Sequence, residues 1–336
     1  MNPNVNTKHN THNKKTLLLT LLLIAILLIT TTLIIGKLTE RTVVDVLFDT
    51  PVSLEKAVLV TSEKELKTAV NNAQSKTSKA VIIALDDDIA LTETLTIPKN
   101  KRIILTSNNN NNNGEGVRGD AFFKLMGANE ENTITVCEKG GLRIAGIIVT
   151  HAKGDRGRGA YVEPYGTLIL SYGKISDNMY HSYAGVVNWG TFIMCGGEVS
   201  YNNATGRDTW GNLGASRGGS GGGVYNCGAF IMNGGEIKNN VSMEYGGGVR
   251  NMGNFVMSGG EISYNTASAG GGVANGDIFV MSGGEISYNT ATWRGGGVSS
   301  NNSDANMFKG RISDNNAERG PNLLVVDENG KTIINK

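Results

Sequence analysis

The chain has 336 residues, among them 46 glycines and only 5 prolines, and its 31 basic and 30 acidic residues give a net charge of +1. This length is enough for one large domain or two ordinary ones. Balanced charge without a dense lysine and arginine stripe excludes an extended nucleic-acid surface, so no nucleic acid is expected as a partner. Its 3 cysteines form no even disulfide set and no CxxC motif, which predicts small buried or half-buried thiols.

The N-terminal segment predicts a membrane anchor. Residues 16–36, "TLLLTLLLIAILLITTTLIIG", carry no charge, and a helix over them would be roughly 30 Å long, the thickness of one hydrocarbon core. Lysines precede the run, so we expect residues 1–15 as a cytoplasmic tail, residues 37–56 as a linker and residues 57–336 outside the cell. A cleaved signal peptide is the alternative and would make the protein secreted, although no clear cleavage site follows the run.

Residues 57–80 predict an N-terminal cap. Within "TSEKELKTAVNNAQ", residues 61–74, Ser62 and Glu65 have the spacing of a capping box. An apolar stripe follows at Leu66, Ala69, Val70 and Ala73. We therefore expect a short amphipathic helix that closes one end of the domain, because a solenoid must cover its terminal repeats.

A repeat organises the rest of the chain. "GGGVRNMGNFVMSGGEISYNTA" at residues 246–267 is followed by "GGGVANGDIFVMSGGEISYNTA" at residues 270–291, and the glycine triplets begin at 221, 246, 270 and 295. Such a period marks a solenoid, and the short apolar runs broken by Gly, Asn and Ser indicate strands and turns. We predict an all-β fold, a right-handed parallel β-helix of about nine coils of 24–25 residues, each coil adding about 4.8 Å.

Strand alternation assigns inward columns. Phenylalanine and methionine at Phe192 and Met194, and at the same place in the next coils, should stack in the bore. Two asparagine columns should form amide ladders along the solenoid. Their members are Asn188, Asn226, Asn251 and Asn275 in one, and Asn178, Asn202, Asn240, Asn265, Asn289 and Asn315 in the other.

The outward columns form the candidate binding surface. An aliphatic run on an exposed sheet marks a contact surface, and exposed aromatic rings suit sugar stacking or protein contact. The candidate residues are Ile193, Ile231, Val256 and Val280 together with Tyr201, Tyr264 and Tyr288. Two alternatives stay open for the aliphatic column: the insertion at residues 205–220 or a neighbouring chain covers it, or it has no role.

A row of glutamates is the candidate metal site. Glu198, Glu236, Glu261 and Glu285 recur at one repeat position, where like charges in register cost energy unless they are solvated or share a cation. Solvated turn positions are one interpretation, and a weak divalent site for Ca²⁺ at Glu236, Glu261 and Glu285 is the other. No other cofactor is expected.

No catalytic constellation stands out in the sequence. A glycosidase needs two carboxylates in different environments, and a lyase needs a basic residue beside calcium-binding aspartates. Lys174 and Arg311 replace the repeat's glutamate without an aspartate ladder beside them, and His151 is expected at the surface. The pattern favours a protein without catalytic activity and leaves the question open.

The cap and the coils together carry a family resemblance. "ELKTAVNNA" and "IIALDDDIALTETLTIPKNKRIILTS", followed by coils such as "GGGVYNCGAFIMNGGEIKNN", resemble the adhesin-like right-handed parallel β-helix repeat proteins. This group belongs to the pectate-lyase-like superfamily and is related in pattern to polymorphic outer-membrane-type surface proteins. The resemblance covers Leu59 to the end. It implies surface display and, for many members, binding to glycans or cells.

Three functions emerge as hypotheses. The first is a membrane-anchored cell-surface protein that adheres to glycan or protein through its outward sheet surfaces. The second is a polysaccharide lyase or glycoside hydrolase on the same scaffold. The third is a passive envelope or spacer protein.

Overall fold

The computed structural model describes residues 44, 51–75, 79–108, 122–205, 218–301, 305–307, 309–326 and 332–335. The predicted anchor 16–36, the tail 1–15 and most of the linker 37–56 lie outside this set. Among the residues described, no helix combines the length and the apolarity needed to cross a bilayer. Val43–Lys336 forms one compact unit.

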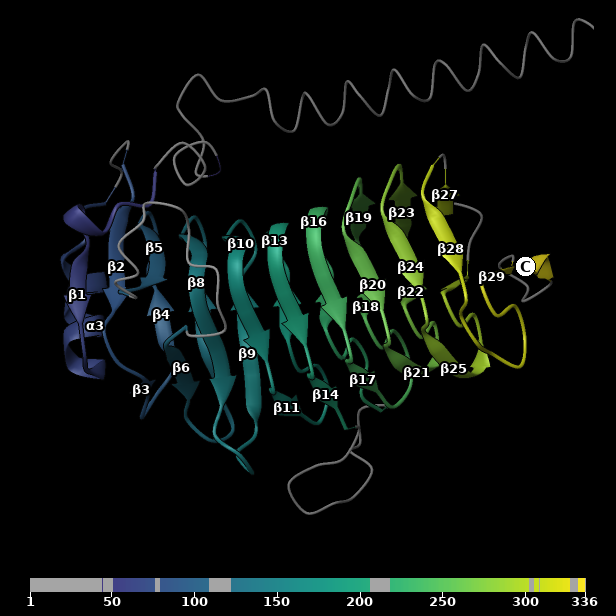
Figure 1. Ribbon diagram of the computed structural model, residues 1–336, viewed down its shortest axis with the longest axis horizontal. Helices are drawn as coiled ribbons and strands as arrows, with labels where there is room; N and C mark the ends of the chain where they lie inside the picture. The colour runs from purple at the N-terminus through teal and green to yellow at the C-terminus, as the bar shows by residue number, and fades with distance from the viewer. Residues whose placement is uncertain are drawn as a thin grey trace, which may run out of the picture. The chain divides into compact units, whose positions relative to one another are not determined.

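The unit is an all-β parallel solenoid of about nine turns. Each turn of the chain contributes strands to successive sheets, and equivalent strands stack along one axis, with α3 (Glu63–Asn72) at the N-terminal end (Figure 1). Strand pairs are parallel from coil to coil, except that β29 and β30 are antiparallel. The predicted β-helix is therefore confirmed at the level of a parallel β-solenoid.

Three sheets form its walls. The main path of the largest sheet consists of β1 (Val58–Val60), β2 (Val81–Leu85), β5 (Arg102–Ser107), β8 (Gly141–His151), β10 (Thr167–Ser176), β13 (Thr191–Ser200), β16 (Ala229–Lys238), β19 (Asn254–Met257), β23 (Ile278–Met281) and β27 (Ala305–Met307). The same sheet includes β3 (Ile89–Ala90), β6 (Lys124–Gly127), β20 (Glu261–Ser263), β24 (Glu285–Ser287) and β28 (Arg311–Ser313).

The second sheet has ten strands and the third has five. The second consists of β4 (Leu95–Ile97), β7 (Glu131–Val136), β9 (Gly157–Val162), β12 (Val186–Asn188), β15 (Val224–Asn226), β18 (Val249–Asn251), β22 (Val273–Asn275), β26 (Val298–Ser300), β29 (Leu323–Val326) and β30 (Thr332–Asn335). The third consists of β11 (Met179–Tyr180), β14 (Asn203–Ala204), β17 (Val241–Ser242), β21 (Thr266–Ala269) and β25 (Thr290–Arg294).

The bore is filled by side chains in register. Phe192, Phe230, Phe255 and Phe279 are fully buried, and their rings stack from coil to coil with centroids 4.9, 4.6 and 4.9 Å apart. Offset-stacked aromatic pairs contribute about 0.5–1.5 kcal/mol beyond their buried area. The predicted phenylalanine column is thus confirmed, and it fixes which residues of successive coils are neighbours.

Double glycines bend the long strands of the first sheet. Gly197 and Gly235 have φ of 72° and 84°, a region that costs glycine little. A Cβ at Gly235 would also lie 2.7 Å from the Met194 side chain of the preceding coil. In the next coil the bend interrupts the strand, so that β19 and β20 take the place of one continuous strand.

Both asparagine ladders are present in the interior. In each rung the Nδ2 of one asparagine donates to the Oδ1 of its counterpart in the following coil, at 2.7–2.8 Å from Asn188 to Asn275 and at 2.9–3.0 Å from Asn178 to Asn315. The predicted ladders are confirmed. They satisfy amides that would otherwise be costly to bury.

His151 corrects one prediction. We expected it at the surface, but it is only 5 % exposed, and its Nδ1 lies 2.7 Å from the Oδ1 of Asn178. The imidazole therefore takes the place of an amide at the start of one ladder. Its role was hidden in the sequence because the coil of His151 has no asparagine to continue the column, and only the contact with Asn178 shows that the imidazole extends the ladder.

The helix α3 begins at a side-chain cap. Ser62 Oγ accepts a hydrogen bond from the Glu65 backbone N–H at 3.4 Å, and the Glu65 carboxylate accepts one from the Thr61 N–H at 2.8 Å. The second bond differs from a standard capping box, in which Glu65 would reach the N–H of Ser62. Leu66 and Val70 from this helix belong to the core that fills the bore.

Candidate binding surface

The aliphatic column faces away from the bore, but much of it is covered. Ile193, Ile231, Val256 and Val280 follow one another in register, outside the phenylalanine column. Ile193 and Val280 are only 5 and 7 % exposed, and Ile231 and Val256 are half-buried. The expectation of an exposed aliphatic contact surface is therefore wrong for Ile193 and Val280.

At Ile193 the cover includes the N-terminal flank of the solenoid, through Val44 and Ala57. Ile193 clusters with Ile82, Ile104 and Ile169 on the outer face of the first sheet. Val44, Ala57, Ala80, Ala145, Cys195 and Ile231 pack against this cluster. Alternation along a strand indicates the side on which a residue lies, but not whether another segment lies over that side.

The tyrosine column is exposed. Tyr201, Tyr264 and Tyr288 are 57, 55 and 50 % exposed. They follow β13, β20 and β24 directly, at the corner where the chain turns toward the third sheet. The rings of Tyr264 and Tyr288 are stacked, with centroids 5.2 Å apart and planes 8° from parallel.

These tyrosines occupy a backbone conformation that does not suit them. Their φ angles are 54°, 56° and 56°, and this left-handed region costs a non-glycine residue about 1 kcal/mol or more. Asn and Asp tolerate it best. Other coils place those residues at the same corner: Asp177, Asn239 and Asp314, with φ of 58°, 55° and 58°. The corner itself therefore does not require tyrosine.

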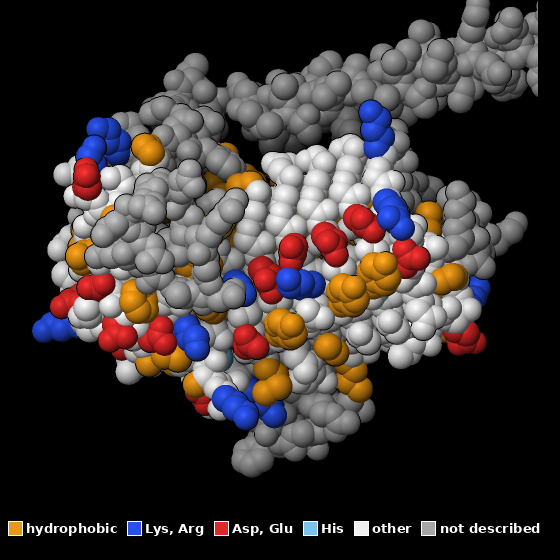
Figure 2. Space-filling model, viewed as in Figure 1, with side chains coloured by type: hydrophobic (Ala, Val, Ile, Leu, Met, Phe, Trp, Pro, Cys, Tyr) orange, Lys and Arg blue, Asp and Glu red, His pale blue; other side chains and the backbone are white. Residues whose placement is uncertain are grey.

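A row of glutamates runs beside the tyrosines. Glu198, Glu236, Glu261 and Glu285 are in register, and the last three line an open groove of about 490 Å³ together with glycines. Figure 2 shows a row of acidic side chains crossing this face, with apolar side chains alongside. We call Glu198, Glu236, Glu261, Glu285, Tyr201, Asn239, Tyr264 and Tyr288 the Glu–Tyr strip.

Cations stand at both ends of the glutamate row. Lys174 replaces the glutamate of the preceding coil and lies 3.7 Å from Glu198. Arg311 replaces it in the following coil and lies 3.8 Å from Glu285. These pairs lower the cost of bringing carboxylates into register, although exposed pairs contribute little each.

Lys238 contacts two glutamates of the Glu–Tyr strip. Its Nζ is 2.5 Å from a Glu236 oxygen and 3.5 Å from a Glu198 oxygen. The hydrogen bond to Glu236 raises the pKa of Lys238 despite its partial burial. The other coils place serine here: Ser200, Ser263, Ser287 and Ser313.

The structure adds nothing in favour of the predicted calcium site at Glu236, Glu261 and Glu285. Within the described part of the chain, no group of three or more His, Cys, Asp or Glu side chains is arranged to hold a metal ion. Lys238 and Arg311 already compensate two of the three carboxylates. The row is consistent with solvated carboxylates held by neighbouring cations.

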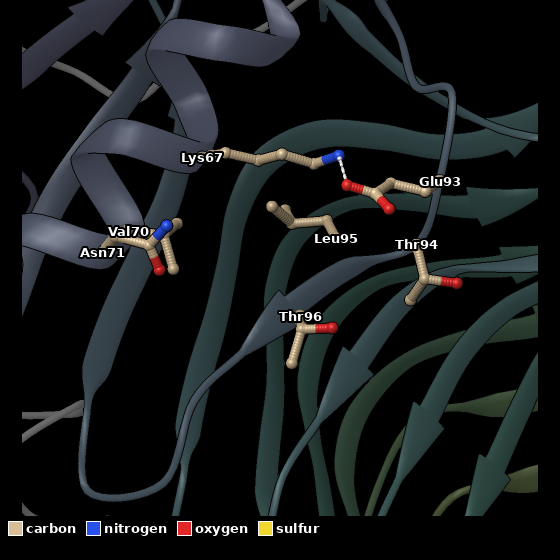
Figure 3. Close-up of a pocket in the computed structure, with 7 residues that line it drawn as sticks. All are labelled: Lys67, Val70, Asn71, Glu93, Thr94, Leu95 and Thr96. Atoms are coloured by element: carbon tan, nitrogen blue, oxygen red, sulfur yellow. Dashed lines mark hydrogen bonds and ion pairs between the residues drawn. The ribbon is translucent and has the colours of Figure 1, made fainter.

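A second, smaller pocket of about 200 Å³ lies between α3 and β4. Figure 3 shows that Lys67 reaches from the helix across the pocket to Glu93, at 2.7 Å. Lys67 also pairs with Glu63 at 2.6 Å. These contacts tie the helix to the first coil, so the pocket serves attachment of the cap.

The described residues provide no support for catalysis. Glu236, Glu261 and Glu285 line one open groove, and Glu198 is paired with Lys174 and Lys238. Burial raises the pKa of all three thiols, Cys137, Cys195 and Cys227, which disfavours the nucleophilic thiolate. All three cysteines are free and half-buried, as predicted.

Comparisons with protein-family models, with curated proteins and with solved structures found no significant match.

Proposed function

We propose that this protein is a glycan-binding β-solenoid that uses the Glu–Tyr strip as its binding surface. The observation that carries the proposal is the placement of Tyr201, Tyr264 and Tyr288. Each is at least half exposed and occupies a left-handed corner that Asp or Asn fills in other coils. Backbone outliers of this kind are held by the surrounding structure and cluster at binding and active sites.

The chemistry of the strip suits a polar, ring-shaped ligand. Tyrosine faces stack on the apolar faces of sugar rings, and the phenolic oxygen remains available for hydrogen bonding. Carboxylates accept hydrogen bonds from hydroxyl groups, and Lys238 is a donor beside them. These are the groups that recognise a carbohydrate on an open surface.

The net negative charge of the strip favours neutral glycans as ligands. The strip contains four carboxylates, Glu198, Glu236, Glu261 and Glu285, and Asp177 and Asp314 add two more at the corner positions of other coils. Three cations, Lys174, Lys238 and Arg311, lie beside these six carboxylates. The acidic excess repels uronate polymers, which argues against the acidic polysaccharides that a lyase of this fold class would bind.

Display on the cell surface is part of the proposal. Residues 16–36 would anchor the protein in the membrane, with residues 1–15 in the cytoplasm and the solenoid outside. The right-handed sense of the coil and the kinship with adhesin-like β-helix proteins belong to the same proposal, and the family resemblance at residues 59–336 supports them.

The test is a binding experiment with the full-length protein in detergent. Neutral oligosaccharides, cellohexaose and chitohexaose, are titrated and polygalacturonate serves as the anionic comparison. The triple variant Tyr201→Asn, Tyr264→Asn, Tyr288→Asn should lose binding by about tenfold or more without any drop in its thermal midpoint, because Asn tolerates the left-handed corner better than tyrosine does.

Tyr165→Asn is the matched control. Tyr165 is 78 % exposed and also has a positive φ, of 66°, but it lies outside the strip. Its replacement should leave binding unchanged. If the wild type binds no neutral oligosaccharide, or if the triple variant binds as well as the wild type, the proposal fails. Binding of a protein instead of a glycan would also overturn it.

A further inference from the structure

The tyrosine column contains a gap of one coil. Hydrogen bonds between neighbouring corners order the residues along the axis: Tyr201 N–H donates to Lys238 O, and Asn239 N–H donates to Ser263 O. The order is Asp177, Tyr201, Asn239, Tyr264, Tyr288 and Asp314. Asn239 therefore lies between two tyrosines, and its side chain is half-buried.

The gap has the width of one sugar ring. Tyr264 and Tyr288 occupy adjacent coils, and at 5.2 Å between centroids they leave no room between them. Tyr201 and Tyr264 are two coils apart, roughly 10 Å. A ring in contact with both tyrosines needs about 3.5–4.0 Å on each side. One ring therefore fits with little space to spare, and two stacked rings do not fit.

The coil of Asn239 also differs from its two neighbours at the position before the corner. Lys238 stands there where the neighbouring coils have Ser200 and Ser263. Its Nζ contacts Glu198 from the Tyr201 coil and Glu236 from its own coil. A donor and two acceptors thus lie on the coils that border the gap.

We propose that the gap at Asn239 is a slot in which Tyr201 and Tyr264 sandwich a single pyranose ring of a neutral glycan. This inference rests on the proposed function and adds the position and the size of the ligand unit. Asn239 leaves the space free, while Lys238 and its carboxylate partners bind hydroxyl groups at the rim. Tyr288 stacks behind Tyr264 and holds that ring in place.

The decisive variant is Asn239→Tyr. Tyrosine already occupies this corner in three coils, so the variant should fold and complete the aromatic stack, which fills the slot. We expect affinity for cellohexaose or chitohexaose to fall by roughly tenfold or more, with the fold retained and the thermal midpoint lowered slightly, because tyrosine tolerates the left-handed corner less well than Asn. Asp314→Tyr is the matched control, because it adds a tyrosine at the end of the same column without filling the slot, and it should bind as the wild type does.

The outcomes separate the two proposals. If the triple tyrosine variant loses binding while Asn239→Tyr binds as well as or better than the wild type, the slot is wrong and the tyrosine surface stands. If neither variant changes binding, or the wild type binds neither oligosaccharide, both proposals fail. Loss of binding in Asn239→Tyr and the triple variant, with binding retained in Asp314→Tyr, supports the slot.

Discussion

Asn251 shows how much a single rung of a ladder contributes. Its Nδ2 donates to Asn275 Oδ1, to Gly253 O and to Ile278 O, each at 2.8 Å, and its Oδ1 accepts from Asn226 at 2.7 Å. All of these bonds except the one to Ile278 O are buried, and a buried polar atom without a partner costs about 1–3 kcal/mol. The residue therefore holds three successive coils together through one amide.

We predict that Asn251→Ala lowers the free energy of unfolding by about 3 kcal/mol or more, because several buried groups lose their partner at once. Urea denaturation followed by circular dichroism measures the effect. Asn233→Ala, at an exposed asparagine, should change stability by less than about 0.5 kcal/mol. Equal effects of the two substitutions would contradict a structural role for the ladder.

For single residues, the sequence predicts well which identical side chains stack from coil to coil, but it predicts backbone strain poorly. Phe192, Phe230 and Asn251 could be placed because the same residue recurs at each repeat. The left-handed corner escaped prediction because tyrosine does not signal it. Asp177 and Asn239 at the same repeat position were the available signal, since both residue types favour that conformation.

The outer face of the first sheet illustrates what an element reveals by itself. In the first four residues of β10, β13 and β16, before the bend, the side of each residue follows from its position, because side chains alternate along a strand. Burial depends on a second element that covers the face, here the N-terminal flank with Val44 and Ala57. That contact joins residues that are distant in sequence, and the hydrophobic periodicity of a strand does not predict it.

Burial along the aliphatic column predicts unequal costs of truncation. Ile193→Ala removes a side chain from a packed cluster and should cost about 2–4 kcal/mol. Val256→Ala, at a half-buried site, should cost about 1 kcal/mol or less. The denaturation midpoints of the two variants measure the difference. A larger loss for Val256→Ala would show that the cover lies elsewhere.

The cap helix makes a prediction about pH. Partial burial pushes the pKa of Glu63 upward, but hydrogen bonds from Lys67 and Thr92 outweigh it, and the pKa lies below its ordinary value. A lowered pKa in the folded state stabilises the protein above the unfolded pKa of about 4.3, and this stabilisation is lost as pH falls through the folded value.

Glu63→Gln should therefore lower the thermal midpoint at pH 7, and the difference from the wild type should shrink below about pH 4. Thermal scans across this pH range test the expectation. Glu55→Gln, at an exposed site before the solenoid, serves as the control and should show no such trend. A difference that grows toward acid would contradict the assigned contacts.

On the scale of the whole molecule, coils are interchangeable units. Each packs only on its two neighbours, so removing one complete repeat should leave its former neighbours able to pair. Phe192 would stack directly on Phe255 if residues 221–245 were deleted, because the columns keep their register.

Two single-coil deletions should therefore fold alike and bind differently. Deleting residues 221–245 removes Asn239, brings Tyr201 beside Tyr264 and closes the slot, so glycan binding should be lost. Deleting residues 246–269 removes Tyr264 and leaves Asn239 between Tyr201 and Tyr288, so binding should persist. Circular dichroism checks the fold and oligosaccharide titration checks binding. The reverse pattern of binding would refute the slot.

The ladders also give the solenoid an electrical direction. Rung after rung, the amides of both columns donate toward the C-terminal coil and accept from the N-terminal side, so the side-chain dipoles add along the axis, whereas those of sheet backbones largely cancel. The asparagines are buried, and a low-dielectric interior screens dipoles less than water does. Each ladder is therefore a weak dipole along the solenoid axis. In the longer ladder the end toward His151 is partially negative and the end toward Asn315 is partially positive. Two copies of the solenoid placed head to tail would attract each other, whereas two copies placed head to head would repel each other.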